Sequence, residues 1–447
     1  MNRILSFCQL AGILAASSLS ALAATAPEQQ AQPVHYTITD LGPANGSTPG
    51  QPFSIRNDGL IAASASVANA WHAMLLFEGW QIDLAKTGGL GGANSAAFGV
   101  NQRGQAAGEA ETSDADPKLE DFCGFGTQRI CKAFVWQNGA MTALPTLKDA
   151  TGISGRNAVA KGINIRGQVA GASENTTADS TCPAYDPGPT TLQFQTYEFK
   201  PVIWTEGVIN QLPTSGADAK GNAFNDPDGV VFRINDSGVA VGATGSCSGY
   251  TAFLTYLNSL HATLWRHGAV TDLGNLGGVA PGLGNFAYDI NRFDHVVGTS
   301  GTSDGSFHAF FWSDNTLIQD LGAVEDDVAS AGLAISDSGD IGGVSFPADP
   351  SASPRAFIRP DGGTMVDLNS LIPADSPLYL FSACSINARG EIIGLALDAQ
   401  GNFHGFLATP GNRTSDWFDL PPAARAARFE HAWSLVRSRP GLWRKRP

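Results

Sequence analysis

The chain has 447 residues, of which 43% are hydrophobic and only 15% are charged, and it contains 52 Gly and 25 Pro. That hydrophobic content is enough to bury a core, which excludes wholesale disorder, and the abundance of Gly and Pro is typical of a turn-rich fold. The net charge of −14 argues against a nucleic-acid binder, because affinity for nucleic acid comes from Lys and Arg on phosphates.

The N-terminus has the pattern of a secretory signal peptide. Arg3 provides a positive start, an apolar run extends from Ile4 to Leu19, and Ala21-Leu22-Ala23 is a small-x-small cleavage site. Ala24-Thr25-Ala26 is a second possible cleavage site, and a retained membrane anchor is the alternative, although the run is shorter than the ~20 residues of a membrane span. We therefore expect a signal peptide at 1–23, a linker at 24–34, no transmembrane span, and a secreted, periplasmic or cell-surface bacterial protein.

A phrase in three parts then recurs seven times. Its first part is usually an aromatic residue, a small residue, Ile or Val, and Asn, with a Gly three residues further on; its second part is a short apolar run such as VVGT. Its third part is His, Lys or Arg, then Ala, apolar residues and usually Trp, followed by a turn and a short strand. The Ile or Val anchors of the seven copies are Ile55, Val100, Ile163, Ile234, Ile290, Ile335 and Ile386.

The repeat predicts an all-β, seven-bladed β-propeller over residues 35–420. The smallest anchor spacing, 45 residues, matches a propeller blade of roughly 40–50 residues, and each copy holds four short β-type runs. An open β repeat array is the alternative. The segment HYTITDLG (35–42) copies the last strand of a repeat without a repeat before it, which suits ring closure, but residues 416–420 also look like a last strand. Either segment could close the ring.

These phrases resemble a family of bacterial extracellular repeat proteins called HAF repeats. The resemblance rests on HAFFW (308–312), VTDLGNLGG (270–278) and INIRGQVAG (163–171), and it covers about residues 35–420. It implies secretion and a repeated β architecture. It implies no catalytic residues, because the family has no established activity to transfer.

The cysteines fit an exported protein with disulfides. Cys123 and Cys131 lie in one Gly-containing loop and are expected to pair. Cys182 and Cys247 occupy equivalent loops of consecutive repeats and could pair across neighbours. No Cys or His spacing indicates a metal site.

The longest variable segments are predicted to share one face. Successive connections in an up-and-down blade alternate between the two faces of the disc, and the long segments 109–131, 172–199 and 243–260 fall at equivalent connections. Variable loops on a rigid scaffold are where binding sites are usually built. The candidate ligand-binding residues on these insertions are Asp114, Asp116, Glu120, Asp121, Asp179, Tyr185, Asp186, Tyr197 and Tyr250.

Carboxylates with aromatics suit contacts with carbohydrate, or Ca²⁺, although no cofactor is required and no complete Ca²⁺ loop is present. His72, His261, His308 and His404 hold one repeat position and are predicted to be structural, because a ring spreads them apart. The first functional hypothesis is therefore a non-catalytic protein that binds an extracellular or surface ligand, carbohydrate or protein. The alternative is an exported hydrolase or lyase acting on a polymer such as a polysaccharide, with paired loop carboxylates.

The C-terminal segment 421–447 differs in kind. It has seven Lys or Arg and one acidic residue. Phe429, Trp433 and Val436 follow a helical spacing, which predicts a short amphipathic helix in this basic tail.

Overall fold

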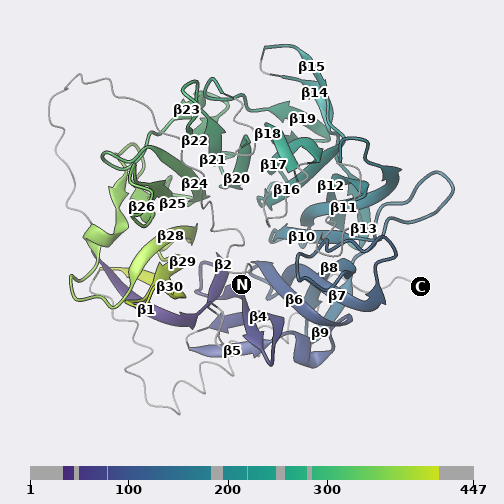
Figure 1. Cartoon of the computed structure of the whole chain (residues 1–447), viewed down its shortest axis with the longest axis horizontal. Helices are drawn as coiled ribbons and strands as arrows, with labels where there is room; N and C mark the ends of the chain where they lie inside the picture. Colours follow the sequence, from purple (N-terminus) through teal and green to yellow (C-terminus); the bar gives the residue numbers. More distant parts are fainter. Residues whose placement is uncertain are drawn as a thin grey trace.

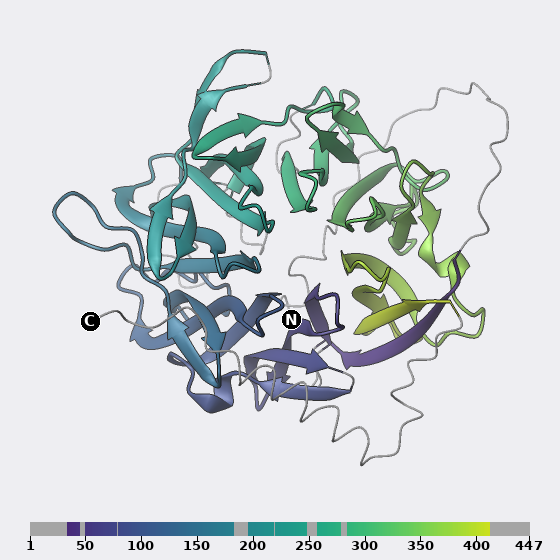
Figure 2. The ribbon, with the colours of Figure 1, turned by 180° about the vertical axis from the view of Figure 1, so that it is seen from behind.

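The computed structural model describes residues 34–44, 50–77, 79–182, 195–218, 220–247, 257–278 and 284–411. Seven four-stranded antiparallel sheets are arranged around a central axis (Figure 1), and the same ring is seen from behind in Figure 2. The seven-bladed propeller predicted from the repeat is therefore confirmed. The signal peptide, the 416–420 segment and the basic tail lie outside the described residues.

Each of blades 1 to 6 contains four strands that are consecutive in the chain. Blade 1 is β2 (Gln51–Ile55), β3 (Ile61–Val67), β4 (Ala70–Phe77) and β5 (Trp80–Asp83). Blade 2 is β6 (Gly91–Val100), β7 (Ala106–Ala115), β8 (Arg129–Gln137) and β9 (Ala140–Ala143). Blade 3 is β10 (Ala158–Ile163), β11 (Val169–Ala178), β12 (Tyr197–Thr205) and β13 (Val208–Gln211).

The second half of the ring follows the same plan. Blade 4 is β16 (Asp228–Ile234), β17 (Ala240–Cys247), β18 (Leu257–Arg266) and β19 (Ala269–Asp272). Blade 5 is β20 (Phe286–Ile290), β21 (Val296–Gly301), β22 (Phe307–Ser313) and β23 (Leu317–Asp320). Blade 6 is β24 (Ala329–Ile335), β25 (Ile341–Phe346), β26 (Arg355–Arg359) and β27 (Val366–Asp367).

Blade 7 joins the two ends of the described chain. It consists of β28 (Tyr379–Ile386), β29 (Ile392–Leu397) and β30 (Phe403–Pro410), and its outer strand is β1 (Tyr36–Pro43). β1 pairs antiparallel with β30 from Tyr36 opposite Pro410 to Pro43 opposite His404. The early TITDL segment therefore closes the ring.

Additional short elements occupy the connections. A hairpin of β14 (Ser215–Ala217) and β15 (Ala223–Asn225) links blades 3 and 4 and extends outward from the ring (Figure 1). The sequence indicated only a loop there. The helices in the described part are two short 3₁₀ turns, η1 (Ala85–Thr87) and η2 (Leu368–Leu371). None of the described helices has the length and apolarity that crossing a membrane requires.

The first part of the repeat phrase forms the innermost strand of each blade and carries a β-bulge. The pairing register with the second strand shifts at the same repeat position in all seven blades, around the residue that opens the phrase. These bulged residues are Phe53, Phe98, Lys161, Phe232, Tyr288, Leu333 and Cys384. A bulge redirects a side chain, and here the redirected positions surround the axis.

The bulge also explains the Gly in the second part of the phrase. At Gly108, Gly171 and Gly242, an added Cβ would lie 1.9 Å from a carbonyl oxygen of the bulged innermost strand. Only a residue without a side chain fits so close to the neighbouring backbone. The two parts of the phrase therefore recur together because one accommodates the other.

The repeated Asn ties most blades to the next. The Asn101 side-chain amide donates to the Asn164 carbonyl oxygen at 2.8 Å, and Asn164 donates in the same way to Asn235 at 2.9 Å. The same bond continues from Asn235 to Asn291, from Asn291 to Ser336 and from Asn387 to Arg56. Arg56 Nη1 donates to the Asn101 carbonyl oxygen and continues the ring where blade 1 lacks the Asn.

The third part of the phrase forms the outer strands. His72 contacts Asp83 at 2.8 Å and His308 contacts Asp320 at 2.9 Å, each pair joining neighbouring strands of one blade. In blade 7 the partner of His404 is Asp40 of β1, so the closing strand reproduces the pairing of an ordinary last strand. These contacts agree with the prediction that the repeated histidines have a structural role.

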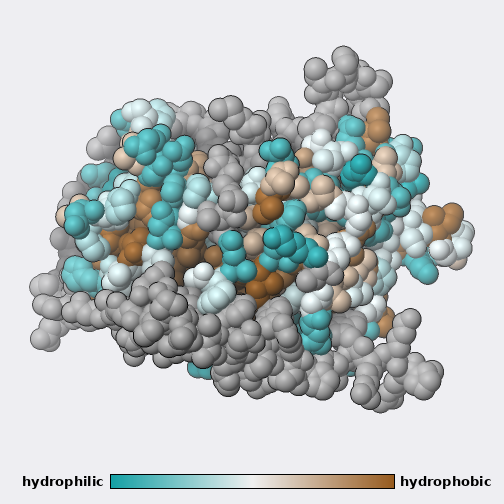
Figure 3. All heavy atoms as spheres, turned by 90° about the horizontal axis from the view of Figure 1, so that it is seen from below, coloured by the Kyte–Doolittle hydropathy of each residue, from teal (hydrophilic) through white to brown (hydrophobic). Residues whose placement is uncertain are grey.

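Seen edge-on in Figure 3, the described surface is mostly hydrophilic to neutral with scattered hydrophobic residues. The core lies between the blades. Most hydrophobic clusters combine residues of two adjacent blades; one, for example, contains Ala107 and Val135 of blade 2 with Val169 and Trp204 of blade 3. Burial of these facing sheets is the main force that holds the ring together.

Candidate ligand-binding site

The connections divide into two faces, as expected from the strand order. The turn between the first and second strand has five residues in every blade, for example 56–60 and 101–105. We call the face that carries these turns the short-turn face, and the opposite one the insertion face. The long connections leave their strands at the insertion face, and the flanking strands extend into the predicted ranges, so that β7 ends at Ala115, β11 at Ala178 and β17 at Cys247. Residues 183–194 and 248–256 of these connections lie outside the described residues.

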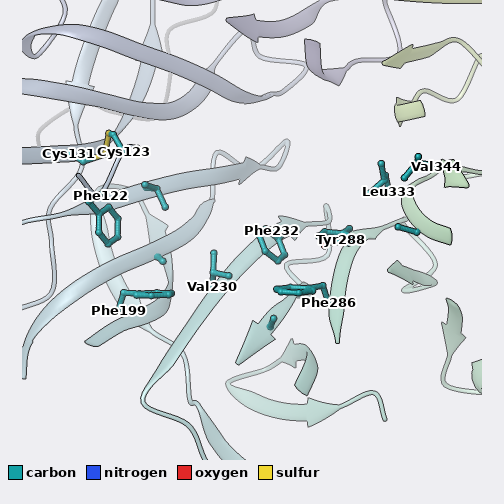
Figure 4. Packing of buried hydrophobic residues seen from close by; sticks show 14 residues of the cluster. Phe122, Cys123, Cys131, Phe199, Val230, Phe232, Phe286, Tyr288, Leu333 and Val344 are labelled. Carbon is teal, nitrogen blue, oxygen red and sulfur yellow. A yellow bond between two sulfur atoms is a disulfide. The ribbon is translucent and has the colours of Figure 1, made fainter. Parts of the chain in front are cut away.

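Two disulfides fasten these insertions, as the sequence predicted. Cys123–Cys131 closes the blade 2 insertion onto β8, with 5.5 Å between the Cα atoms. Cys182–Cys247 joins the blade 3 insertion to β17 of blade 4, with 4.9 Å between the Cα atoms. The first disulfide stands at one end of a buried apolar arc that reaches Val344 on the far side of the ring (Figure 4).

The predicted acidic residues of the blade 2 insertion mostly point inward. Asp114 is exposed, whereas Asp116, Glu120 and Asp121 are buried. Asp116 accepts the Lys118 amide at 2.7 Å, and Asp121 accepts the Gly126 amide at 2.8 Å. These carboxylates therefore shape the loop, and of the four only Asp114 is placed to meet a ligand.

At the junction of blades 2 and 3, Glu120 meets Glu174 of β11. Both side chains are buried, and burial raises the pKa of each carboxyl, with the charge of the other adding to the rise at Glu174. Asn157 donates from its side chain to both Asp116 and Glu120 at 3.1 Å, and its backbone amide donates to Glu174 at 2.9 Å. Two carboxyl groups in such contact are held by sharing a proton.

An equivalent pair lies at the next junction. Asp179 meets Asp228 at the start of β16, and Gln195 Nε2 donates to Asp179 at 3.0 Å and to Asp228 at 2.9 Å. Burial, followed by the charge of Asp179, raises the pKa of Asp228 well above its ordinary value. Asp228 also accepts the Phe199 amide at 2.9 Å, so the pair ties the blade 3 insertion to blade 4.

The structure does not bring the remaining candidate ligand-binding residues together. Tyr197 is half-buried at the start of β12. Tyr185, Asp186 and Tyr250 lie outside the described residues. Sequence reasoning missed Glu174, Asn157 and Asp228, although one signal was available: Asp228 occupies the repeat position that holds Asn94 and Asn157 in the two preceding blades.

The insertion face also carries an open groove between blades 1 and 2, with a volume of about 340 Å³. Its polar side chains are His72 and Lys86, and the remainder of its lining is small or aliphatic: Val67, Ala68, Ala70, Ala85, Gly89, Gly91, Gly92 and Ala93. This volume falls in the range of ligand pockets, roughly 300–1,000 Å³. The groove adjoins the base of the blade 2 insertion, because Gly91 pairs with Thr112 of β7.

His72 is held in place within this groove. Its Nδ1 contacts Asp83 Oδ2 at 2.8 Å, which leaves Nε2 as the nitrogen for a ligand. The other three histidines at this repeat position make similar contacts, but His72 is the one of the four that lines the groove.

In the described part of the chain, two groups of close carboxylate and sulfur atoms have the spacing of a metal site: Glu109 with Cys123 and Cys131, and Asp179 with Cys182 and Cys247. Both sulfurs of each group form a disulfide and supply no thiolate ligand. A Ca²⁺ site remains a prediction.

No family model and no curated protein matches the chain. Among solved structures, it is similar to a putative gluconolactonase, with 10% identity and a TM-score of 0.25, covering 54% of this chain and 92% of the other. It is also similar to a fucose-recognising six-bladed lectin of Aleuria aurantia, with 9% identity and a TM-score of 0.34, covering 83% of this chain and 96% of the lectin.

A third similar structure is dipeptidyl peptidase 4 of Porphyromonas gingivalis, with 10% identity and a TM-score of 0.32. The match covers 76% of this chain and 49% of the peptidase. Likenesses this distant identify no ligand and no activity for the protein.

Proposed function

We propose that the protein is a secreted, non-catalytic β-propeller that binds an extracellular ligand on its insertion face, at the groove between blades 1 and 2 and the adjoining blade 2 insertion. The observation that carries this proposal is the groove itself, a ligand-sized recess on the face where the disulfide-fastened insertions lie.

The lining favours an oxygen-rich ligand, such as a carbohydrate chain. Lys86 is a hydrogen-bond donor, and Nε2 of His72 is an acceptor when Nδ1 donates to Asp83, so the two side chains match the hydroxyls of a carbohydrate, which both accept and donate. Gly89, Gly91 and Gly92 let a ligand approach the backbone closely. A protein segment that presents carbonyl or carboxylate oxygens would accept a hydrogen bond from Lys86 in the same way.

The geometry does not favour the alternative of an exported glycoside hydrolase. Most such enzymes need two carboxyl groups that flank a bound substrate. The carboxyl pairs found, Glu120 with Glu174 and Asp179 with Asp228, are buried within blade junctions, and no Asp or Glu of the described residues lines the groove.

Binding can be tested by applying the purified protein to a glycan array and to immobilised extracellular polysaccharides. We expect Gly89→Trp to abolish binding by filling the groove, since the space at Gly89 is open and its backbone accepts a side chain. Lys86→Glu should weaken binding at least tenfold. Lys220→Glu, on the outlying hairpin, is the matched control and should bind like the wild type. Binding that survives both groove substitutions would refute the site.

Secretion can be tested separately. We expect the protein in the extracellular or periplasmic fraction, with an N-terminus at Ala24 by sequencing and with both disulfides formed. An intact N-terminus beginning at Met1 in a membrane fraction would support the anchor instead.

A further inference from the structure

The two disulfides of the insertion face differ in their access to solvent. Cys123 and Cys131 are buried, with exposed fractions of 2% and 0%. Cys182 and Cys247 are both half-buried. An attacking thiolate must reach a sulfur atom before it can open a disulfide. We therefore expect an external dithiol to reduce the second bond in the folded protein and to leave the first one intact.

A carboxylate stands beside the half-buried disulfide. Asp179 Oδ2 lies 3.5 Å from Cys182 Sγ, and one oxygen of Asp179 and the sulfurs of Cys182 and Cys247 all lie within 4.8 Å of one another. A disulfide sulfur has no proton to donate, so the 3.5 Å contact is not a hydrogen bond while the bond is intact. The distance is close to that between a carboxylate oxygen and a thiolate sulfur on one tetrahedral Zn²⁺, about 3.5 Å for bonds of about 2.0 and 2.3 Å.

Both sides of this cluster are held by contacts other than the disulfide. Asp179 Oδ1 accepts the Thr181 amide at 2.8 Å and the Thr181 hydroxyl at 2.6 Å. The backbone amide of Cys247, from blade 4, donates to the same hydroxyl oxygen at 3.0 Å, and that of Cys182 donates to the Asp179 carbonyl oxygen at 3.4 Å. Reduction therefore leaves both sulfurs beside Asp179, and they share a Zn²⁺ once they have separated to about 3.8 Å.

We propose that Asp179, Cys182 and Cys247 form a redox-controlled site for Zn²⁺ or a similar thiophilic divalent cation, which is closed while the disulfide is intact and forms when an external dithiol reduces it. Two thiolates and one carboxylate supply three ligands, and the half-buried position of the sulfurs leaves the fourth to water. The site is separate from the groove and does not depend on the function proposed above.

The opening step is a thiol–disulfide exchange. One thiolate of the dithiol attacks a cysteine sulfur, forms a mixed disulfide with it and releases the other cysteine as a thiolate; the second thiolate of the reagent then breaks the mixed disulfide. The dithiol is oxidised to its own disulfide, and its two electrons reduce the two cysteines. The two protons of the reagent pass to the cysteine sulfurs and are released to solvent when the cation binds.

The opening step can be tested by treating the folded protein with dithiothreitol, alkylating the free thiols and locating the labels by mass spectrometry. Of the four insertion cysteines, we expect Cys182 and Cys247 to be labelled and Cys123 and Cys131 to remain paired. The buried disulfide is thus the internal control for retention of the fold. A second bond that resists the dithiol, or four cysteines that become labelled together, would overturn the proposal.

Metal binding can be tested by titrating the reduced protein with Co²⁺, whose bonds to thiolates give a charge-transfer absorption. We expect one Co²⁺ per chain, displacement of the absorption by Zn²⁺, and no such signal from the oxidised protein. Cys182→Ser and Asp179→Asn should each weaken Co²⁺ binding by about tenfold or more. Asp114→Asn, at an exposed acid of the neighbouring insertion, is the matched control and should bind like the wild type.

The two variants separate loss of a ligand from loss of the cross-link. Cys182→Ser removes the bond between the blade 3 insertion and blade 4 as well as one ligand, whereas Asp179→Asn keeps both sulfurs and removes only the carboxylate charge. A reduced wild type without thiolate–Co²⁺ absorption would overturn the proposal. Binding to either variant as tight as to the wild type would do the same.

Discussion

The Asp179–Asp228 pair predicts that the unfolding free energy of the wild type falls, relative to that of an Asp228→Asn variant, as the pH rises. Asp228 stands where Asn157 stands in the preceding blade, so Asp228→Asn introduces the residue that blades 2 and 3 carry at this position. The Asn oxygen can still accept the Phe199 amide, and its amide group can donate to Asp179 in place of the shared proton. The substitution therefore removes the carboxyl that titrates and keeps the bond from Phe199, while it loses the bond from Gln195 Nε2 at every pH, because an amide nitrogen cannot accept it.

The direction of this pH dependence follows from the raised pKa of Asp228 in the folded protein. Such a carboxyl contributes stability that is fully present below its unfolded pKa, which we take as the ordinary value of 3.8, and that is lost as the pH rises through the folded pKa. One pKa unit corresponds to about 1.4 kcal/mol. Over that window the wild type should lose about 1.4 kcal/mol of unfolding free energy per pH unit relative to Asp228→Asn.

Urea unfolding at a series of pH values from 4 to 8, with the disulfides intact, measures this difference. A change of about 1 kcal/mol moves the Tm of so large a domain by only about 1–2 °C, so chemical unfolding is more sensitive than melting. Asp114→Asn, at an exposed acid of the neighbouring insertion, is the control and should follow the wild type. A variant that is less stable than the wild type by a constant amount at every pH would refute the shared proton.

Three further predictions concern the repeat itself. Asn164→Ala should lower the unfolding free energy by about 1–2 kcal/mol in urea, because it removes the hydrogen bond to the Asn235 carbonyl oxygen of the next blade and the acceptor of the Arg166 and Gln168 amides; an unchanged midpoint would contradict the Asn contacts between blades. Gly171→Ala should cost about 1–3 kcal/mol or more by overpacking against the bulge, measured in the same way; a neutral result would show that the bulge can move. The pKa of His308 is raised chiefly by its hydrogen bond to Asp320, so the stabilisation that this pair contributes is fully present below pH 6.5 and is lost as the pH rises through the folded pKa of His308. His308→Gln should therefore lower the unfolding free energy more at pH 5.5 than at pH 8.5. An equal lowering at both pH values would argue against the ion pair.

Much of the fold could be predicted from the sequence, because the residues that recur in the repeat make the same contacts in several blades. The Asn that most copies of the phrase carry bonds the next blade, and the Gly of the second part faces a bulge. The closing strand was visible as one of two candidates, since the Asp40 segment copies the strand that carries Asp83 and Asp320 in other blades. A contact that recurs in several blades selects the same residue type at the same repeat position, and the seven copies of the phrase make this pattern recognisable in the sequence.

The candidate site was less predictable because its contacts are not repeated. Asp116 and Glu120 were expected to face a ligand, yet they turn inward because Asn157, far along the chain, offers them a hydrogen-bond donor. Composition distinguishes an acidic loop from an apolar one, but it gives no distance between its carboxylates and another blade. The groove escaped notice for a similar reason, since Gly and Ala around His72 carry no pattern of their own.

Hydrogen exchange of β1 tests the central claim, a ring closed by the early strand, most directly. We predict that the amides of Tyr36–Pro43 that bond to β30 are protected as strongly as those of Phe403–Pro410, because both strands belong to one blade. If peptides covering 36–43 exchange as fast as a free linker while residues 416–420 are protected, the later segment closes the ring and closure by β1 is wrong.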